Sequence, residues 1–421
     1  MKKVYFLIMV LCLTSISSIY AVDVLTLTTT DGIGAALSAY IGTGDVTVVI
    51  PAGYTSVEFT GTTTTNIIVP ITIKNLVIQG DGTNPTLLMK GFTLPTSSLT
   101  SLIVKDLTLT GIEDPATGTV SLGNYLAQSA VTVTSVTLDN CTIANFRGVF
   151  RMNAGNNFTN LTIDNCIFRN IGTYNVINPG GTLTNLTVTR STFYGINGNV
   201  FALSVPTGVP APTTVTISDC TFADVDFVGG KYFIDLGAAN VTTALTITNT
   251  ILGKTLSATA KGINIGTTYT VTNSYATTDW VTSANNVTGF TAYANAQSSL
   301  FRSPSIYSSV TTTATPIITT TEATVGDYTI VDASFAGKNN AGDPRWYLVS
   351  TAVFSPKSSS TVISYNGKQI SLNEAQNVAI YSATGELLKS AKMVNVMSLG
   401  SLAKGIYMVK AGATSQKFIV Q

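Results

Sequence analysis

The sequence predicts an all-β protein in which a parallel β-helix with three strands per coil is followed by a small C-terminal β-sandwich. The first observation is a recurring phrase, which reads "VTLDNCTIANF" from Val136, "LTIDNCIFRNIG" over residues 161–172, "LTVTRSTFYGI" from Leu186 and "VTISDCTFADV" from Val215. The second is its interval of 24 to 34 residues, because periods of ~20–50 residues are typical of solenoids, propellers and arrays. The third is the alternation of aliphatic residues with Thr and no helical period, which favours a β-solenoid.

Residues 1–21 have the features of an export signal. Lys2 and Lys3 precede the apolar run Val4–Leu13, and small and polar residues then lead to Ala21. The apolar run is too short to span a bilayer, so we expect no membrane span in the mature chain.

Alternation within the recurring phrase assigns its residues to two faces of a strand. The inward column is entirely aliphatic: Ile73, Val104, Leu138, Ile163, Val188, Ile217, Ile247 and Val271. The outward neighbours are mostly Thr: Thr72, Ile103, Thr137, Thr162, Thr187, Thr216, Thr246 and Thr270. The sequence therefore predicts continuous aliphatic stacks, with equivalent residues of successive coils ~4.8 Å apart.

A column of Asn and Asp follows these strands. Its members are Asn75, Asp106, Asn140, Asn165, Arg190, Asp219, Asn249 and Asn273. Asn and Asp tolerate left-handed backbone geometry best among the non-glycine residues, so we expect a sharp bend and coil-to-coil hydrogen bonds there. Arg190 interrupts the column, and we expect a local change of turn at that coil.

The second and third strands of each coil continue the pattern. The second begins with an inward column of Leu76, Leu107, Cys141, Cys166, Ser191, Cys220, Thr250 and Ser274. We interpret the three cysteines as buried core residues, because the coil spacing exceeds the ~3.5–4.5 Å that Cβ atoms need for a disulfide. The third strand follows a variable loop and points Phe150, Ile177, Phe201, Ile234 and Ile263 inward, and Arg151, Asn178, Ala202, Asp235 and Asn264 outward.

Composition excludes several classes of function. The chain contains no histidine, which removes Ser-His-Asp triads and most zinc sites. Its net charge is +1, and only 10% of its residues are charged. We therefore expect no nucleic-acid partner.

Three strands per coil with an Asn column at a tight turn resemble the right-handed parallel β-helix of the pectate-lyase superfamily. The stretch "GIGAALSAYIGTGDVTVVIPAGYTS" (32–56) looks like the capping helix and first strand of such folds. The stretch "VGDYTIVDASFAGKNNAGDPRWY" (325–347) is similar to the closing segment of uncharacterised secreted β-helix families common in Bacteroidetes. The resemblance implies an N-terminal cap over residues 22–60 and a β-helix over residues 61–347.

Residues 361–421 are similar to the C-terminal sorting domain of type IX secretion cargo, after a predicted linker at residues 348–360. The similarity rests on "NVAIYSATGELLKS" (377–390) and "SLGSLAKGIYMVKAGATSQKFIV" (398–420). Short alternating strands with Gly turns predict a small β-sandwich. The resemblance implies export through the periplasm to the cell surface or the medium, with the type IX secretion machinery as a partner.

Resemblance to pectate lyases implies cleavage of an acidic polysaccharide by β-elimination, which needs a base and positive charge from calcium, Arg or Lys. The predicted groove is the outer face of the third strands with its flanking loops, where Asp224 and Asp226 also lie. The predicted catalytic residues are Arg151, Asp235 and Lys231. The predicted substrate-binding residues are Arg147, Arg169, Asn178, Tyr174, Tyr194, Tyr232 and Asn264. Calcium is a candidate cofactor, although no run of residues matches a calcium motif.

Two other functions compete with the lyase. The same groove would serve a non-catalytic carbohydrate-binding or adhesive surface protein that acts as a monomer on an extracellular polysaccharide. A minor alternative is an ice-binding solenoid, because "LTVTR", "TVTISD" and "TYTVTN" give Thr-x-Thr rows. Thr is favoured on exposed strands in general, and Asn160, Asn185, Asp139 and Asp164 interrupt the rows.

Overall fold

The fold is described from a computed structural model of the chain. The structure describes residues 23–40, 42, 44–55, 66–94, 99–111, 113–114, 119–120, 125–129, 132–152, 157–172, 174–204, 210–225, 229–284, 287–304, 325–348, 363–365, 369–382, 387–400, 402–411 and 414–420. The predicted export signal and residues 349–360 of the predicted linker lie outside the described residues. The chain divides into two compact units, residues 1–348 and 349–421.

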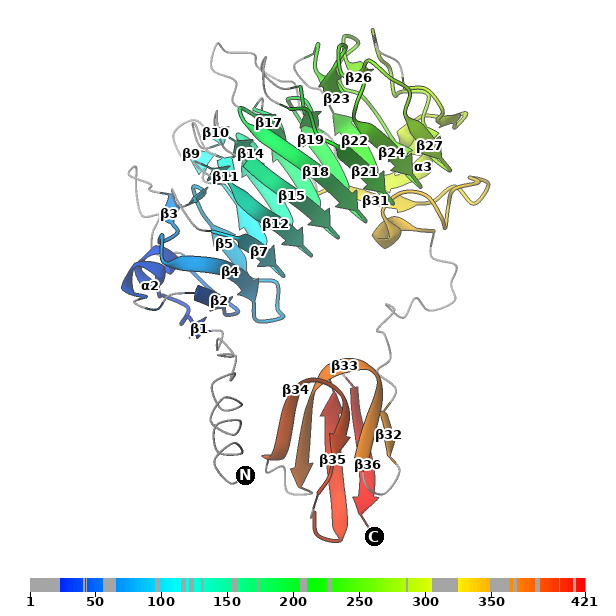
Figure 1. Ribbon diagram of the computed structural model, residues 1–421. Coiled ribbons are helices and arrows are strands. Elements are labelled where there is room, and N and C mark those ends of the chain that lie inside the picture. Colours follow the sequence, from blue (N-terminus) through cyan, green and yellow to red (C-terminus); the bar gives the residue numbers. More distant parts are fainter. Residues whose placement is uncertain are drawn as a thin grey trace, which may run out of the picture. The chain divides into compact units, whose positions relative to one another are not determined.

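The first unit is a parallel β-solenoid of about 8 turns, which confirms the predicted fold class. From Ile73 to Ile265, each coil contributes one strand to each of three parallel sheets, A, C and B in chain order (Figure 1). Sheet A contains β1 (Asp23–Thr26), β2 (Gly44–Ile50), β4 (Ile73–Gly80), β7 (Ser101–Lys105), β12 (Val133–Asp139), β15 (Asn157–Asp164), β18 (Thr182–Thr189), β21 (Thr214–Ser218), β24 (Ala244–Thr248) and β27 (Thr270–Thr272).

Sheets C and B complete each coil. Sheet C contains β5 (Thr86–Leu88), β8 (Thr108–Thr110), β13 (Thr142–Phe146), β16 (Ile167–Ile171), β19 (Thr192–Ile196), β22 (Thr221–Val225), β25 (Ile251–Leu252), β28 (Tyr275–Ala276) and β29 (Thr291–Ala292). Sheet B contains β3 (Ile67–Ile68), β6 (Phe92–Thr93), β11 (Tyr125–Ser129), β14 (Gly148–Met152), β17 (Ile177–Pro179), β20 (Phe201–Ala202), β23 (Tyr232–Gly237) and β26 (Lys261–Ile265). The short strands β9 (Glu113–Asp114) and β10 (Thr119–Val120) pair with each other.

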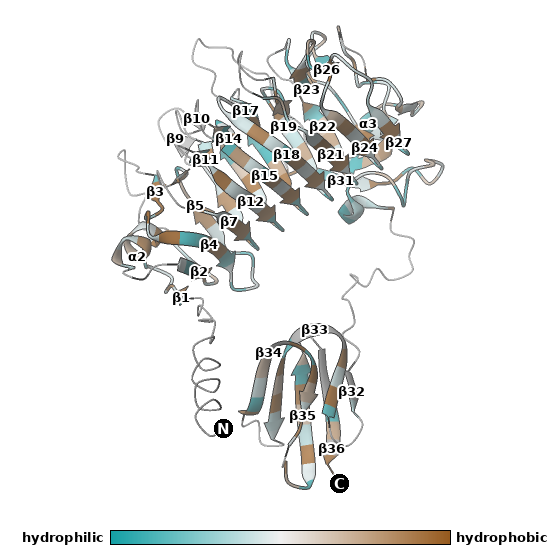
Figure 2. Cartoon of the chain, in the orientation of Figure 1, coloured by the Kyte–Doolittle hydropathy of each residue, from teal (hydrophilic) through white to brown (hydrophobic). Residues whose placement is uncertain are grey.

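The core consists of the predicted stacks. In sheet A, Val104, Leu138, Ile163, Val188, Ile217, Ile247 and Val271 lie in register on successive strands. In sheet C, the stacked rings of Phe168, Phe193 and Phe222 are 4.6 and 4.9 Å apart. Figure 2 shows the resulting alternation of hydrophobic and more polar residues along the strands. Cys141, Cys166 and Cys220 are free and buried, which confirms their interpretation as core residues.

The bend between sheets A and C uses left-handed backbone geometry. Positive φ angles of 46–56° occur at Asp106, Asn140, Asn165, Arg190, Asp219, Asn249 and Asn273. The amide of Asn140 donates to Asp106 Oδ1 at 2.8 Å, and that of Asn165 donates to Asn140 Oδ1 at 3.0 Å. The predicted bend and hydrogen-bonded column are confirmed for these coils.

Two sequence predictions about this bend are wrong. Arg190 keeps the same left-handed geometry, with φ of 47°, so the turn does not change there. In the first coil, Ile78 and not Ile73 pairs with Val104. The predicted column members Asn75, Thr72 and Leu76 are therefore out of register as well, because β4 continues to Gly80 before it bends.

The ends of the solenoid are closed by different elements. At the start, α2 (Ile33–Ala39) buries Ile33 and Leu37 in the core, and β1 pairs in parallel with β2. At the end, residues 293–304 and 325–348, here called the strap, contain α3 (Gln297–Leu300), β30 (Phe301–Ser303), β31 (Asp327–Ile330) and η1 (Pro344–Trp346). The strap packs on the outer face of sheet C in a second hydrophobic cluster that contains Tyr194, Ala223 and Ile251.

The second unit is a small antiparallel β structure. It contains β32 (Ile363–Tyr365), β33 (Gln369–Ser382), β34 (Leu387–Ser398), β35 (Gly405–Ala411) and β36 (Thr414–Val420). The ring centroids of Tyr365 in β32 and Phe418 in β36 lie 5.0 Å apart. The first and last strands in the order β32-β33-β35-β36 therefore meet around the hydrophobic core of this unit. Within the described part of the chain, no helix is both long and apolar enough to cross a membrane.

Candidate binding face

The outer face of sheet B carries a row of polar residues in register. Arg151 of β14 lies beside Asn178 of β17, and Ala202 of β20 lies beside Asp235 of β23, which is followed by Asn264 of β26. Their inward neighbours Phe150, Ile177, Phe201, Ile234 and Ile263 are buried in the core. The predicted outward row therefore exists, because the period-two alternation of the strands holds through these coils.

The N-terminal half of this face is an interlocked cluster of Arg and Tyr. The guanidinium carbon of Arg147 lies 3.5 Å from the ring centroid of Tyr174, and that of Arg151 lies 5.4 Å from Tyr125. The two Tyr rings meet edge to face at 6.0 Å, and the Asn178 amide donates to the Tyr125 hydroxyl at 3.0 Å. Burial raises the pKa of Tyr125, so its phenol stays neutral. We call these five residues the Arg–Tyr cluster.

The C-terminal half carries a second cation–ring pair and a carboxylate. The Lys261 ammonium nitrogen lies 4.9 Å from the centroid of Tyr232. Asp235 Oδ1 accepts hydrogen bonds from the Asn264 amide at 2.7 Å and from the backbone N–H of Gly237 at 3.2 Å. The carboxylate of Asp235 is thus already held by neighbouring residues of its own face.

The three predicted catalytic residues do not converge. Arg151 and Asp235 are separated by three strand spacings of ~4.8 Å, or ~14 Å in all. Lys231 immediately precedes β23 and lies four residues before Asp235, or ~13 Å of extended chain. A base and a cation that act on one sugar must each come within hydrogen-bond reach of it, at ~2.6–3.2 Å. This geometry therefore does not place the trio in one catalytic centre.

Three other predicted positions lie away from this face. Arg169 and Tyr194 are neighbours on the outer face of sheet C, where Tyr194 is buried against Tyr328 of the strap, with ring centroids 5.0 Å apart. Asp224 is buried at a corner of the coil and accepts from Gln297 Nε2 at 2.7 Å and from the Tyr328 hydroxyl at 2.9 Å. Burial raises the pKa of Asp224 to about 6. Asp226 lies outside the described residues.

The sequence prediction missed Tyr125 and Lys261. Tyr125 lies in β11, in the coil of Asp106, for which no third strand was assigned from the sequence, so no alignment marked it. Lys261 opens the third-strand segment "KGINIG" (261–266), and alignment of that segment with "YFIDLG" (232–237), which places Lys261 beside Tyr232, could have marked it as part of this face.

Nothing in the described residues forms a metal site of the usual kind. Within those residues, no group of three or more His, Cys, Asp or Glu side chains could hold a metal ion. Calcium prefers several converging carboxylate or carbonyl oxygens, and the row on sheet B contains the single carboxylate of Asp235. The residues of this face do not fit a calcium ion, so we derive no step through one.

Comparison with known proteins adds no family. No model of a known protein family matches the chain, and no curated protein is significantly similar to it. Functional inference therefore depends on the fold and on the geometry of its faces.

Proposed function

We propose that the solenoid binds an extracellular polysaccharide along the outer face of sheet B, from β11 to β26. The observation that carries this proposal is the Arg–Tyr cluster. Tyr125 is buried, so the half-buried ring of Tyr174 is the one available to stack against the C–H faces of sugars, and Arg donates paired hydrogen bonds to carboxylates. The five N–H groups of a guanidinium lie in its plane, so an Arg that stacks on a Tyr ring can still donate from its edge.

Charge favours an acidic polysaccharide. Arg147, Arg151, Lys231 and Lys261 lie on or beside this face, against the single carboxylate of Asp235 in the row. Successive coils repeat the face every ~4.8 Å, so an extended chain that runs along the solenoid axis would meet one coil after another. Fold resemblance to the pectate-lyase superfamily points to the same class of ligand.

Binding without cleavage fits the geometry better than a lyase does. Elimination needs a base at one carbon and a cation at the adjacent carboxylate, and the candidates for these roles lie ~13–14 Å apart. We therefore propose a carbohydrate-binding or adhesive role. Appearance of an unsaturated, ultraviolet-absorbing product from polygalacturonate or alginate would contradict this choice and restore the lyase.

The binding test compares one double variant with a matched control. Arg147→Ala with Arg151→Ala should weaken binding of polygalacturonate or alginate at least tenfold, because hydrogen bonds to charged groups contribute about 1.5–3 kcal/mol. Arg302→Ala removes an exposed Arg of the strap and should leave affinity unchanged. Affinity electrophoresis and calorimetry of the purified chain would measure both. Equal affinity of all three proteins would remove the assignment of the face, and no binding to any acidic or neutral polysaccharide would remove the function.

We also propose that the chain is exported and that residues 361–421 act as its sorting module. Support comes from the features of residues 1–21, from the resemblance of the C-terminal stretches, and from a C-terminal unit with its own core. In a bacterium with a type IX system, the full chain should reach the surface or the medium. A chain that ends at residue 360 should accumulate in the periplasm, and equal export of both would contradict the proposal.

A further inference from the structure

The outer face of sheet A carries a regular array of hydroxyl groups over its four C-terminal strands, β18, β21, β24 and β27. Two adjacent columns lie in register without a shift. They contain Thr187, Thr216, Thr246 and Thr270 in the first column, and Thr189, Ser218, Thr248 and Thr272 in the second. We call these eight residues the threonine grid.

The hydroxyl groups of the grid are almost all left to solvent. Thr189 Oγ1 donates to Asp164 Oδ1 at 2.7 Å. Among the described residues, the other seven hydroxyls make no hydrogen bond to protein, and all eight side chains are half-buried or exposed. An unpaired hydroxyl on such a surface bonds to water, so the grid presents seven hydroxyls to the solvent at fixed positions.

The backbone holds these groups in a two-dimensional repeat. Neighbouring strands place equivalent residues ~4.8 Å apart, and alternate residues of one strand lie ~6.6 Å apart. Seven of the eight residues are Thr, which is branched at Cβ and has a restricted χ1, so their hydroxyl and methyl positions repeat with little side-chain entropy to lose on binding; Ser218 supplies the hydroxyl without the methyl group.

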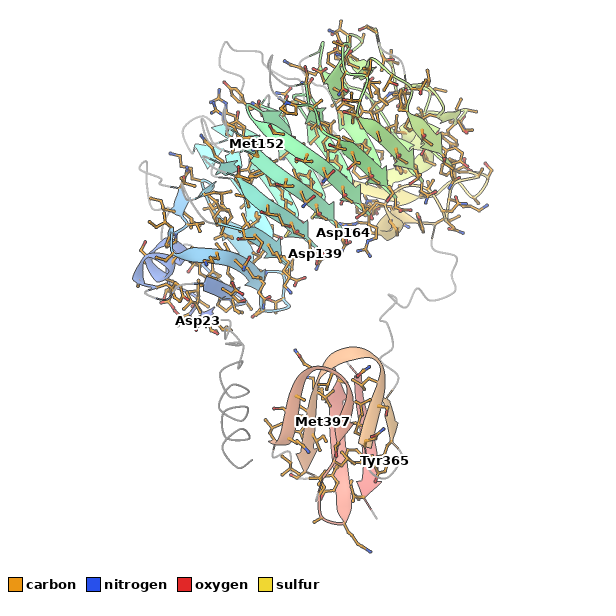
Figure 3. The ribbon with its side chains drawn as sticks, viewed as in Figure 1. Asp23, Asp139, Met152, Asp164, Tyr365 and Met397 are labelled. Atoms are coloured by element: carbon orange, nitrogen blue, oxygen red, sulfur yellow. The ribbon has the colours of Figure 1, made fainter. Side chains whose placement is uncertain are left out.

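Charge is confined to the border of the grid. In the second column, Asp139 and Asp164 occupy the two preceding strands, β12 and β15 (Figure 3). Arg190, which follows Thr189, is paired with Asp164. Inside the grid, all eight positions are uncharged and none is aromatic, in contrast to the Arg–Tyr cluster on sheet B. Such a face suits an uncharged ligand that itself repeats in two dimensions.

We propose that the threonine grid binds the surface of ice. A crystalline water lattice offers donors and acceptors at regular spacing, which a rigid array of hydroxyls can meet at many points together. The Thr methyl groups between the hydroxyls limit competing arrangements of liquid water. A sugar chain would be held better by rings and charged groups, which this face lacks. This activity would be separate from polysaccharide binding on sheet B.

The test uses the purified full chain in assays of thermal hysteresis and of ice recrystallisation. The unmodified protein should lower the freezing point relative to the melting point and keep ice grains small. Thr216→Lys places a charged, strongly hydrated group at the centre of the grid and should abolish both effects. Thr137→Lys is the matched control, because it lies in the same column of the same sheet, beside Asp139 and outside the grid.

The possible results separate cleanly. Retained activity in Thr137→Lys with loss in Thr216→Lys supports the grid. No ice activity in the unmodified chain, equal activity in both variants, or equal loss in both would overturn it. Unfolding midpoints of the two variants should match that of the unmodified chain, and polygalacturonate affinity measured in parallel should not change. Failure of the ice assays would therefore overturn only the proposal for sheet A, and the polysaccharide assays would still test the proposal for sheet B.

Discussion

The outer faces of sheets B and C follow from the same strand alternation, but the strap covers sheet C, whereas sheet B carries the exposed Arg151. Both faces belong to the same coils, and both carry Tyr and Arg, at Tyr174 and Arg151 on sheet B and at Tyr194 and Arg169 on sheet C. On sheet C the strap covers Tyr194 and forms a hydrophobic cluster with it, whereas Arg151 on sheet B is exposed. The same alternation thus produces a covered surface on sheet C and a solvent-exposed surface at Arg151 on sheet B.

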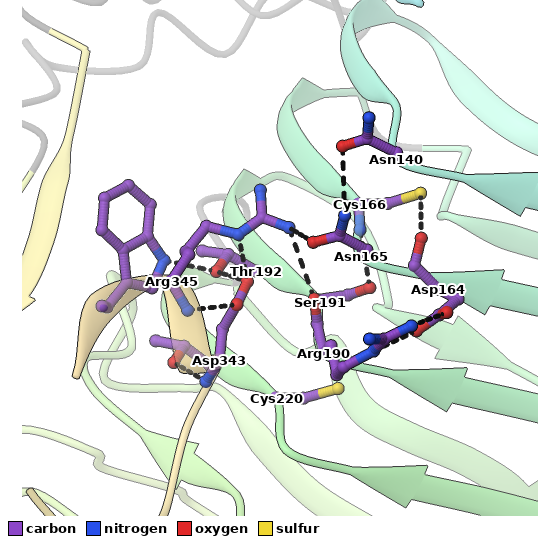
Figure 4. Close-up of polar contacts among 12 residues, drawn as sticks. Asn140, Asp164, Asn165, Cys166, Arg190, Ser191, Thr192, Cys220, Asp343 and Arg345 are labelled. Carbon is purple, nitrogen blue, oxygen red and sulfur yellow. Dashed lines mark hydrogen bonds and ion pairs between the residues drawn. The ribbon is translucent and has the colours of Figure 1, made fainter. Parts of the chain in front are cut away.

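The strap is fixed to sheet C by polar contacts as well as by rings. Asp343 is buried, accepts from the Thr192 hydroxyl at 2.7 Å and pairs with Arg345 at 2.8 Å (Figure 4). Arg345 Nη2 in turn donates to Asn165 Oδ1 at 2.8 Å. The next residue of the Asn column is Arg190, which pairs with Asp164 instead, so Arg345 takes the donor position that an Asn would fill. The strap therefore covers the outer face of sheet C and also supplies, through Arg345, a hydrogen-bond donor to the Asn column.

The largest expected effect separates the covered face from the open one. Tyr328→Ala removes a fully buried ring that contacts Tyr194 and donates to Asp224. It should cost about 3–5 kcal/mol of unfolding free energy. The control Tyr174→Ala, a half-buried ring on sheet B, should cost about 1 kcal/mol. Both tryptophans lie in the first unit, so their fluorescence in a urea titration reports the solenoid, and similar losses would remove the distinction.

Most of the solenoid could be predicted from the sequence because each coil repeats the same local requirements. An aliphatic residue at every second position and, except at Arg190, a residue that tolerates positive φ at the bend recur from Asp106 to Asn273. The first coil was placed out of register because "ITIKNLVIQG" (71–80) offers two aliphatic residues, Ile73 and Ile78, and an Asn before the true bend. The turn at Arg190 was misjudged because backbone hydrogen bonds from neighbouring coils hold its φ despite the side chain.

The candidate site could be predicted only in part. The outward row on sheet B follows from alternation, so Arg151, Asn178, Asp235 and Asn264 were found. The burial of Tyr194 and Asp224 was not predictable, since it depends on Gln297 and Tyr328 of the strap, which lie 73 and 104 positions from Asp224 and carry no repeat. Periodicity reports which way a side chain points, but it does not report what the rest of the chain lays over it.

The next effect concerns two Arg–Asp pairs beside the same Asn column. Arg345→Ala leaves the buried Asp343 without its cation and should cost about 3 kcal/mol or more, because loss of one partner strands a buried charge. Arg190→Ala breaks an exposed pair with Asp164 and should cost at most about 1 kcal/mol. Urea titrations of both variants at neutral pH would measure the difference. Equal losses of unfolding free energy in Arg190→Ala and Arg345→Ala would contradict the prediction that the buried Arg345–Asp343 pair stabilises the protein more than the exposed Arg190–Asp164 pair does.

A smaller effect should appear as a dependence on pH. Burial raises the pKa of Asp224 from 3.8 to about 6, with Asp279 nearby adding to the shift and Lys254 opposing it. The folded protein then binds this proton more tightly than the unfolded chain does. The stability from this group is therefore present below pH 3.8 and is lost as pH rises to about 6. At about 1.4 kcal/mol per pKa unit, the loss is on the order of 2–3 kcal/mol.

Asp224→Asn should remove this dependence with little other change. Asn suits the left-handed geometry of this position, where φ is 49°. The side-chain oxygen of Gln297 is buried without a partner among the described residues, so a rotated Gln297 amide could accept from the new Asn. The difference between the stability curves of the two proteins should slope through the range from 3.8 to about 6 and be flat above it. A constant difference across pH would contradict the assignment.

The smallest effect restores the interrupted column. Arg190→Asn places a residue that tolerates positive φ where Arg is held at 47°, and its amide could donate to the preceding coil as Asn165 does to Asn140. The variant loses the exposed pair with Asp164, worth at most about 1 kcal/mol, so the net gain should be less than about 1 kcal/mol. Arg190→Ala is the matched reference, since it loses the same pair and keeps a Cβ under the same backbone strain. Asn should therefore be the more stable of the two in a urea titration. Equal stability would mean that the column is held by its backbone hydrogen bonds, and that neither the side-chain ladder nor the donor from Arg345 adds measurably to it.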